Sequence, residues 1–240
     1  MGKSLYSQRR GKGTFTFVAT HERADARYIS IDEIQQTDLL IGEIVELVKD
    51  SGRNTALARV LFEDGREELT TAPEHVFVGQ KLEYGKNAKI KIGNVLPLES
   101  IPDGCPVCNI EKSPGDGGYY VKSTGLYGLV GGKEGKFASI KLPSGKTLKI
   151  LLESRATIGC VCGGGRKEKP FMKAGRVFHL MKSRGKHYPG LRGVAMNALN
   201  HPFGGSQHHA GKSKSTSRFA PPGRKVGAIA SKRTGRKKKL

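Results

Sequence analysis

The stretch NTALARVLFEDGREELTTAP, residues 54–73, decides the fold class. Apolar side chains alternate along ALARVLFE, residues 56–63, which is the period of a strand with one buried face. Asp64-Gly65 then forms a turn signal, and a second β-prone run follows it. Short strands separated by Gly/Asp turns are typical of antiparallel sheets.

The same pattern continues on both sides of this stretch. LLIGEIVELVKD at 39–50 precedes it, and HVFVGQKLEYG at 75–85 and AKIKIGNVLPL at 88–98 follow it. ELVKD at 46–50 is also compatible with a helical turn, although it is too short to change the class. We therefore expect residues 29–92 to form one small antiparallel barrel or sandwich.

A second β-rich block follows in residues 93–165. GYYVKST at 118–124, YGLVGG at 127–132 and RATIGCVC at 155–162 all have the composition of strands. In FASIKLPSGKTLKILLES, residues 137–154, Pro143-Ser144-Gly145-Lys146 predicts a hairpin turn. The block predicts a second small barrel, so the expected fold class is all-β.

The charge is concentrated at the two ends of the chain. The net charge is +21, from 42 Lys and Arg against 21 Asp and Glu. Residues 163–240 have 20 basic residues and one acidic residue, whereas residues 29–162 have 16 basic and 18 acidic residues. Such an excess favours a polyanion as partner, because each neutralised phosphate releases a counterion.

Composition excludes several classes of protein. No apolar run approaches the roughly 18 residues that a membrane-spanning helix needs. The first residues, MGKSLYSQRRGKG, lack the apolar core of a signal peptide. We therefore expect a soluble intracellular protein that associates with nucleic acid and not with a membrane.

The ends are expected to be irregular basic extensions. Residues 1–28 form a polar basic arm, and residues 166–240 contain too many glycines for a long continuous helix. The second extension is also too poor in apolar residues to fold alone, so we expect it to become ordered against its partner.

Enzyme motifs in the C-terminal extension are incomplete. Gly211-Lys212-Ser213 resembles the end of a phosphate-binding loop, but five residues rather than four separate it from Gly205, and no strand precedes it. His201 lies near Ser206, but residues 169–240 contain no Asp or Glu to orient a histidine. The sequence therefore contains neither a nucleotide-enzyme loop nor a self-contained hydrolase site. We expect no small-molecule substrate.

RNA binding accounts for the cations, the glycines and the missing carboxylates together. Glycine lets the backbone approach phosphates, and asparagine and histidine can bond base edges and 2′-hydroxyls. We expect Met196, Asn197 and His201 to form a tight loop that faces RNA. The residues expected to neutralise phosphates are Arg9, Arg10, Lys12, Arg166, Lys169, Lys173, Arg176, Lys182, Arg184, Lys186, Arg192, Lys212, Lys214, Arg218, Arg224, Lys225, Lys232 and Arg233.

The four cysteines form two close pairs, Cys105 with Cys108 and Cys160 with Cys162. C-x-x-C is a common half of a zinc site, and two cysteines two residues apart on a strand point to the same face. The four thiolates could therefore bind one Zn²⁺ if the fold brings the pairs together. Reduced thiols and, less readily in a cell, disulfides are the alternatives.

Several motifs together resemble one known family. They occur in the order SPGDGG at 113–118, KLPSG at 141–145, RATIG at 155–159, GGGRKEKPFMKAG at 163–175, RGVAMNALNHPFGG at 192–205 and APPGRKVG at 220–227. The chain is similar over nearly its whole length to the universal large-subunit ribosomal protein L-two family. QRRGKG at 8–13 and IASKRTGRKKK at 229–239 resemble its archaeal or eukaryotic branch.

The resemblance implies a specific architecture and function. It implies an OB-fold barrel followed by an SH3-like barrel, with long extensions embedded in rRNA. It also implies a primary binder of large-subunit rRNA near the peptidyl-transferase region, which supports subunit association, tRNA binding and peptide-bond formation. Expected partners are large-subunit rRNA, neighbouring ribosomal proteins and small-subunit rRNA across the subunit interface, in the cytoplasmic ribosome.

The sequence departs from the family pattern at two places. The loop histidine for which a chemical role has been suggested in the family matches His201, but Phe203 stands where many relatives have a second histidine. We therefore interpret His201 as ordering RNA, with direct chemistry as the alternative and a free nucleic-acid enzyme as a third class. The family often has a cysteine at the position of Cys108 but not at those of Cys105, Cys160 and Cys162, so it gives no support for zinc.

Overall fold

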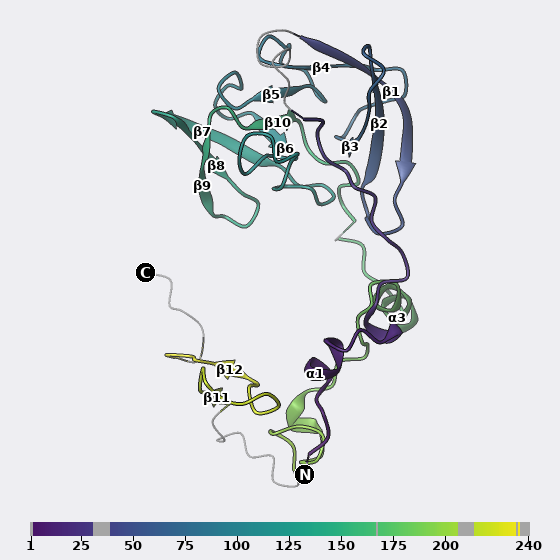
Figure 1. Cartoon of the computed structure of the whole chain (residues 1–240), viewed down its shortest axis with the longest axis vertical. Helices are drawn as coiled ribbons and strands as arrows, with labels where there is room; N and C mark the ends of the chain where they lie inside the picture. Colours follow the sequence, from purple (N-terminus) through teal and green to yellow (C-terminus); the bar gives the residue numbers. More distant parts are fainter. Residues whose placement is uncertain (1, 31–38, 167, 206–213, 234, 236–240) are drawn as a thin grey trace. The chain divides into compact units, whose positions relative to one another are not determined.

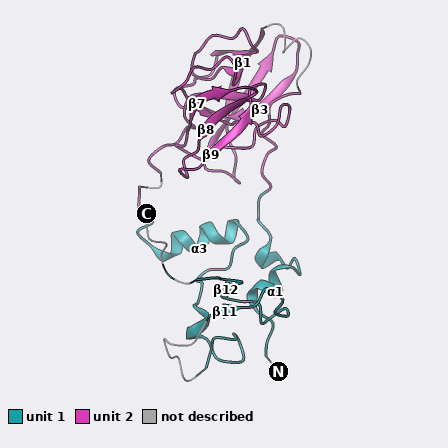
Figure 2. Cartoon of the chain, turned by 90° about the vertical axis from the view of Figure 1, so that its left-hand side faces the viewer, with its two compact units in different colours: residues 1–21, 171–240 teal, residues 22–170 magenta. Residues whose placement is uncertain are grey.

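The computed structural model describes residues 2–30, 39–166, 168–205, 214–233 and 235 (Figure 1). The chain forms two compact units, coloured separately in Figure 2. Residues 22–170 are called the β unit below, and residues 1–21 together with 171–240 are called the basic unit.

The β unit contains one continuous sheet of ten strands. Their order is β3-β2-β1-β4-β5-β10-β6-β7-β8-β9, and all neighbours are antiparallel except β4 and β5. The strands are β1 (Leu40–Lys49), β2 (Ala56–Phe62), β3 (Glu67–Thr71), β4 (Lys81–Tyr84), β5 (Val95–Pro97), β6 (Pro106–Cys108), β7 (Gly128–Glu134), β8 (Phe137–Lys141), β9 (Thr147–Leu151) and β10 (Arg155–Ile158).

Within its described residues, the basic unit has only short elements. Its helices and short strands are α1 (Tyr6–Arg10), a 3₁₀ turn (Phe15–Phe17), α3 (Ala174–Ser183), a second 3₁₀ turn (Gly193–Ala195), β11 (Ser215–Thr216) and β12 (Ala228–Ile229). The prediction of an all-β class is therefore confirmed. The ten-residue helix α3 was not predicted, because Gly175 and Gly185 obscure it in the sequence.

The stretch that decided the fold class forms a hairpin. β2 pairs with β3 from Leu57 opposite Thr71 to Leu61 opposite Glu67. The turn is at Gly65, whose φ of 83° favours glycine, and Asp64 accepts a hydrogen bond from the Arg66 N–H at 2.9 Å. The second predicted turn is also present, because β8 and β9 form a hairpin around residues 142–146.

The sheet encloses two hydrophobic cores that meet at β5. One core gathers side chains of residues 28–95, and the other gathers side chains of residues 88–158. Val95 packs in the first core and Leu96 in the second, because neighbouring side chains on a strand point to opposite faces. β5 also bonds to both β4 and β10, so this three-residue strand connects the two halves of the sheet.

Local predictions of strands are wrong at residues 89–94 and 118–124, and one alternative is excluded. Residues 89–94 form turns rather than a strand, because the buried Asn94 side chain donates to the Lys89 carbonyl at 2.9 Å and Gly93 has a φ of 99°. Residues 118–124 form only an isolated bridge, Tyr120 opposite Ile110, since Gly118 and Val121 have positive φ. ELVK continues β1 and is not a helical turn.

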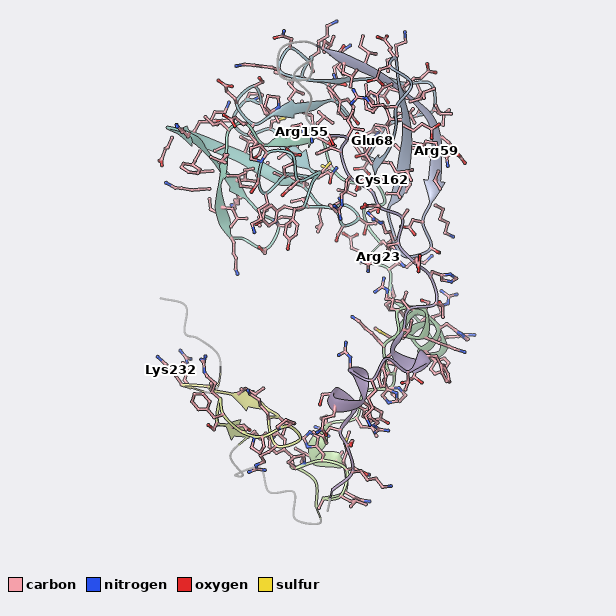
Figure 3. The ribbon with its side chains drawn as sticks, viewed as in Figure 1. Arg23, Arg59, Glu68, Arg155, Cys162 and Lys232 are labelled. Atoms are coloured by element: carbon pink, nitrogen blue, oxygen red, sulfur yellow. The ribbon has the colours of Figure 1, made fainter. Side chains whose placement is uncertain are left out.

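A buried ion pair joins β10 to the loop that follows β6. Glu111 is fully buried, and its carboxylate accepts a hydrogen bond from Arg155 Nη2 at 2.8 Å and one from the Arg155 backbone N–H at 2.8 Å. The Gly117 N–H donates to the same carboxylate at 3.1 Å. The Arg155 guanidinium lies over the Tyr28 ring, 5.1 Å from its centroid. Figure 3 places Arg155 and Glu68 within the β unit.

Glu68 is a second buried carboxylate, on β3. It accepts hydrogen bonds from the Tyr84 hydroxyl at 3.0 Å and from the Ile29 N–H at 2.9 Å. Burial outweighs these bonds and raises the pKa of Glu68 from 4.5 to about 7. The folded state therefore retains a proton that the unfolded chain releases between these two pH values.

We expect Glu68 to make the β unit less stable as pH rises. Its folded-state pKa is raised, so its contribution to stability falls between pH 4.5 and about 7, by about 3 kcal/mol in total. Glu68→Gln removes the titration, so the stability difference between variant and unmutated protein should shift in favour of the variant across this window. Denaturant unfolding of both proteins at a series of pH values measures this difference in the free energy of unfolding.

Glu67→Gln is the matched control, because Glu67 is the exposed neighbour of Glu68 on β3. Its stability difference from the unmutated protein should not vary with pH in the same window. A pH-independent difference for Glu68→Gln would show that Glu68 titrates at its ordinary pKa.

Candidate nucleic-acid interface

The net charge of the chain lies entirely in one of its two units. The basic unit contains 21 Lys and Arg and no Asp or Glu, whereas the β unit contains 21 of each sign. The whole net charge of +21 therefore belongs to the basic unit, and the β unit is neutral. Because the basic unit has no acidic side chain, its cations have no carboxylate of their own unit to pair with.

The basic unit is built from both ends of the chain. The Thr20 N–H donates to the Ser183 carbonyl at 3.2 Å, and the Lys3 N–H donates to the Leu199 carbonyl at 2.8 Å. Gly185 ends α3 with a φ of 60°, and a Cβ there would lie 2.6 Å from the backbone of Val18. The N-terminal arm and the C-terminal extension thus pack as one body.

A stack of three side chains reinforces this packing. The ring of Tyr6 on α1 stacks on the ring of His187 with centroids 4.3 Å apart and planes at 19°. The Arg9 guanidinium lies 4.4 Å from the centroid of the Tyr6 ring. Arg9 was predicted to contact a phosphate, and the contact of Tyr6 with His187 was not predicted, since residues 181 positions apart in sequence give no local signal.

The loop around His201 is held by its own backbone. The N–H groups of Asn200 and His201 both point to the Asn197 carbonyl, at 2.9 and 3.2 Å, and the Gly205 N–H donates to the Met196 carbonyl. His201 Nδ1 accepts a hydrogen bond from the Phe203 N–H at 3.0 Å. In the neutral ring the proton is therefore on Nε2, which leaves Nε2 as a donor.

Two glycines fit closely around this loop. A Cβ on Gly193 would lie 2.3 Å from His201 Cε1, so the absence of a side chain there makes room for the imidazole ring. A Cβ on Gly204 would lie 2.3 Å from the Met196 carbonyl oxygen. A cavity of about 310 Å³ adjoins the loop, with His201 and the N-terminal residues Lys3 and Gln8 among its lining.

β11 and β12 hold the last described part of the extension together. They pair in parallel, and the Ala228 N–H donates to the Lys214 carbonyl at 3.0 Å. A Cβ on Gly227, which has a φ of 79°, would lie 2.6 Å from the Phe203 ring. Phe203 therefore packs against the tail that follows the His201 loop.

All described cations that we expect to contact phosphate are exposed, and Met196 and His201 are half-buried. Lys212 lies outside the described residues. Arg166 and Lys169 belong to the β unit, and the other described cations belong to the basic unit, where Figure 3 labels Lys232. Their contacts with phosphate stay predictions.

The four cysteines are not gathered into one group in the structure. Cys108 is buried on β6 close to Cys160 and Cys162, whereas the Cys105 thiol points to the Pro106 carbonyl at 3.7 Å. Within the described ranges, no three His, Cys, Asp or Glu side chains are grouped to hold a metal ion. All four cysteines are free of disulfides, which favours reduced thiols. The zinc site stays a prediction.

Within the part of the chain that the structure describes, no helix is long and apolar enough to cross a membrane.

Comparison with known proteins gives matches over almost the whole chain. Residues 91–224 match the family model described as "Ribosomal Proteins L2, C-terminal domain". The large ribosomal subunit protein uL2 of Natronomonas pharaonis is 50% identical over 237 residues, which cover 98% of this chain and 97% of that protein. The protein of the same name from Haloarcula marismortui is 50% identical with 98% of each covered, and that of Methanocaldococcus jannaschii is 48% identical with 99% and 100% covered.

Thiol reactivity distinguishes reduced cysteines from a zinc site. Burial raises the pKa of Cys108 to about 12, and it raises the pKa of Cys105, Cys160 and Cys162 to a lesser extent. At pH 8 we expect a disulfide reagent to modify three thiols of the native protein slowly and the fourth only after unfolding.

Cys108→Ala should leave three reactive thiols in both the native and the unfolded protein. One zinc ion per chain in metal analysis of the unmutated protein, lost in Cys160→Ser, would instead establish the four-thiolate site.

Proposed function

The chain belongs to the ribosomal protein L2 family, and on that basis we propose that it is a structural constituent of the large ribosomal subunit that binds rRNA mainly through its basic unit. The fold of this family, an OB-fold barrel followed by an SH3-like barrel, agrees with the two cores that meet at β5. Membership also places the protein in the cytoplasmic ribosome.

The observation that carries the proposal is the separation of charge between the units. A neutral β unit folds around its own ion pairs, of which Arg155 with Glu111 is buried. The basic unit has 21 cations whose mutual repulsion nothing in that unit offsets. RNA phosphates offset it, and the release of their counterions drives binding.

We base the protein's place in the ribosome and its role in translation on the family resemblance. Basic segments lie between RNA helices whose phosphates would otherwise repel each other, near the peptidyl-transferase region. From there the protein supports subunit association, tRNA binding and peptide-bond formation. Neighbouring ribosomal proteins and small-subunit rRNA are further partners of the same proposal.

The proposal treats the protein as a component and not as an enzyme. The basic unit contains no carboxylate that could orient His201 or coordinate a divalent metal. Moreover, Nδ1 of His201 already accepts the Phe203 N–H at 3.0 Å, so the ring braces its own loop. His201 is thus proposed as a positioning residue for the RNA-facing loop.

Arg192→Ala tests phosphate binding. Arg192 is exposed directly before the second 3₁₀ turn, and its loss should weaken rRNA binding and lower the salt slope, d log K/d log [salt], by about one unit in magnitude. Binding of the full chain to large-subunit rRNA over a series of salt concentrations measures both quantities.

Arg59→Ala is the matched control for Arg192→Ala. Arg59 is a half-exposed arginine on β2 of the neutral β unit, 3.6 Å from Glu46, and it is labelled in Figure 3. Its loss should leave the slope unchanged. An unchanged slope for Arg192→Ala as well would refute the assignment of Arg192.

His201→Asn and His201→Ala separate positioning from chemistry. The Asn side-chain oxygen can accept an N–H two residues later, so it can replace Nδ1, but it cannot transfer protons at neutral pH. We expect ribosomes with His201→Asn to keep a near-normal rate of peptide-bond formation and His201→Ala to weaken assembly. A slow chemical step in fully assembled His201→Asn ribosomes would favour direct participation.

A further inference from the structure

Two aromatic rings of the basic unit are almost fully exposed. Phe15 and Phe219 each expose 91% of their surface, more than any other large apolar residue among those described. Burying a benzyl group is favourable, so a partner that covers either ring gains binding free energy. The two rings come from the N-terminal arm and the C-terminal extension.

The exposure does not result from an unstructured backbone. Phe15 opens a 3₁₀ turn in which the Phe17 N–H donates to the Thr14 carbonyl at 2.8 Å. Phe219 lies in a turn in which its own N–H donates to Ser217 Oγ and the Ala220 N–H donates to the Ser217 carbonyl, both at 3.2 Å. Both exposed rings thus belong to residues of hydrogen-bonded turns.

Tyr6, in the same unit, differs from these two residues because its ring makes contacts within the protein. The ring stacks on His187, and the Arg9 guanidinium lies over it. Among the ring–ring and cation–ring contacts of the described residues, none involves Phe15 or Phe219. The faces of these two rings are therefore open to a partner.

We propose that Phe15 and Phe219 are stacking platforms for unpaired bases of rRNA. This rests on the proposed function, and it adds base contacts to a surface so far assigned only to phosphates. Arg218 precedes Phe219, Lys12 lies three residues before Phe15, and the unit carries no acidic side chain. A partner that covers these rings must therefore place negative charge beside a flat apolar surface.

An unpaired nucleotide has both features. Its base has a face that an aromatic ring can stack on, and its phosphate lies within reach of the neighbouring cation. Phenylalanine has no hydrogen-bonding group, so the contact tolerates any base. The two rings thus contribute affinity and hold single-stranded segments in place without reading their sequence.

The test uses the full chain and in vitro transcribed large-subunit rRNA over a series of salt concentrations. Phe219→Ala and Phe15→Ala should each weaken binding by about tenfold, with an unchanged salt slope because no charge is lost. Phe219→Leu should restore little of the affinity, since leucine is apolar but has no ring face. Arg218→Ala is the comparison, and it should lower the slope by about one unit.

Phe77→Ala is the matched control, because Phe77 is 63% exposed on the neutral β unit. It should bind rRNA as the unmutated chain does. Unchanged affinity for Phe15→Ala and Phe219→Ala would overturn the inference. Full recovery with Phe219→Leu would overturn it too, because an apolar contact without ring stacking would then account for the affinity.

These outcomes are separate from the failure of the proposed function. If the unmutated chain bound rRNA with a steep salt slope while both alanine variants bound equally well, only the stacking inference would fail. If the unmutated chain did not bind rRNA at all, both would fail. Thermal unfolding of each variant should match that of the unmutated chain, since neither ring is packed.

Discussion

The β unit depends on the buried carboxylate of Glu111. Removing a charge from water is costly, and the cost is offset only when every oxygen has good partners. Glu111 meets this condition through the Arg155 guanidinium and through the backbone N–H groups of Arg155 and Gly117. Because β10 lies between β5 and β6, fixing Arg155 fixes the neighbour of β5, the strand at which the two cores meet. Loss of one partner alone would leave a bare buried charge, which typically costs about 3–5 kcal/mol.

The same constraint explains why charge is so unevenly divided. A unit that folds by itself must pair its buried charges, as Glu111 is paired with Arg155, and the β unit also has equal total numbers of both signs. The basic unit has few buried residues and no acidic ones, so its free energy depends on what surrounds it. Phosphate is then part of its stability in the sense that ligand binding stabilises a fold. Under the proposed function, the protein combines a body that is stable by packing with a body that RNA binding stabilises.

Features of the structure that neighbouring residues determine could be predicted from the sequence, whereas features that depend on distant residues could not. The β2–β3 and β8–β9 hairpins follow from alternation and turn residues, and both were predicted. Residues 89–94 alternate as a strand does, but the side chain of Asn94 and the positive φ of Gly93 hold them as turns, which no periodicity reveals. The motifs SPGDGG and RATIG indicated the family, but the sequence alone did not show what these residues do. In the structure, Gly117 of the first motif and Arg155 of the second both donate hydrogen bonds to Glu111. The exposed cations were predictable from composition, whereas the stack of Tyr6 on His187 was not, because it joins opposite ends of the chain.

Four glycines of the extension have a packing role that composition did not reveal. Composition suggested that they let the backbone approach phosphates. At Gly185, Gly193, Gly204 and Gly227, however, the space of a side chain is filled by the protein itself. Backbone atoms fill it at Gly185 and Gly204, the His201 ring fills it at Gly193, and the Lys214 carbonyl and the Phe203 ring fill it at Gly227. These contacts fix the Phe203 and His201 rings before any partner arrives. A surface ordered in advance loses less conformational entropy on binding, so more of the favourable counterion release appears as affinity. Glycine therefore serves RNA binding here indirectly, by allowing a strongly charged segment with few apolar residues to pack against itself.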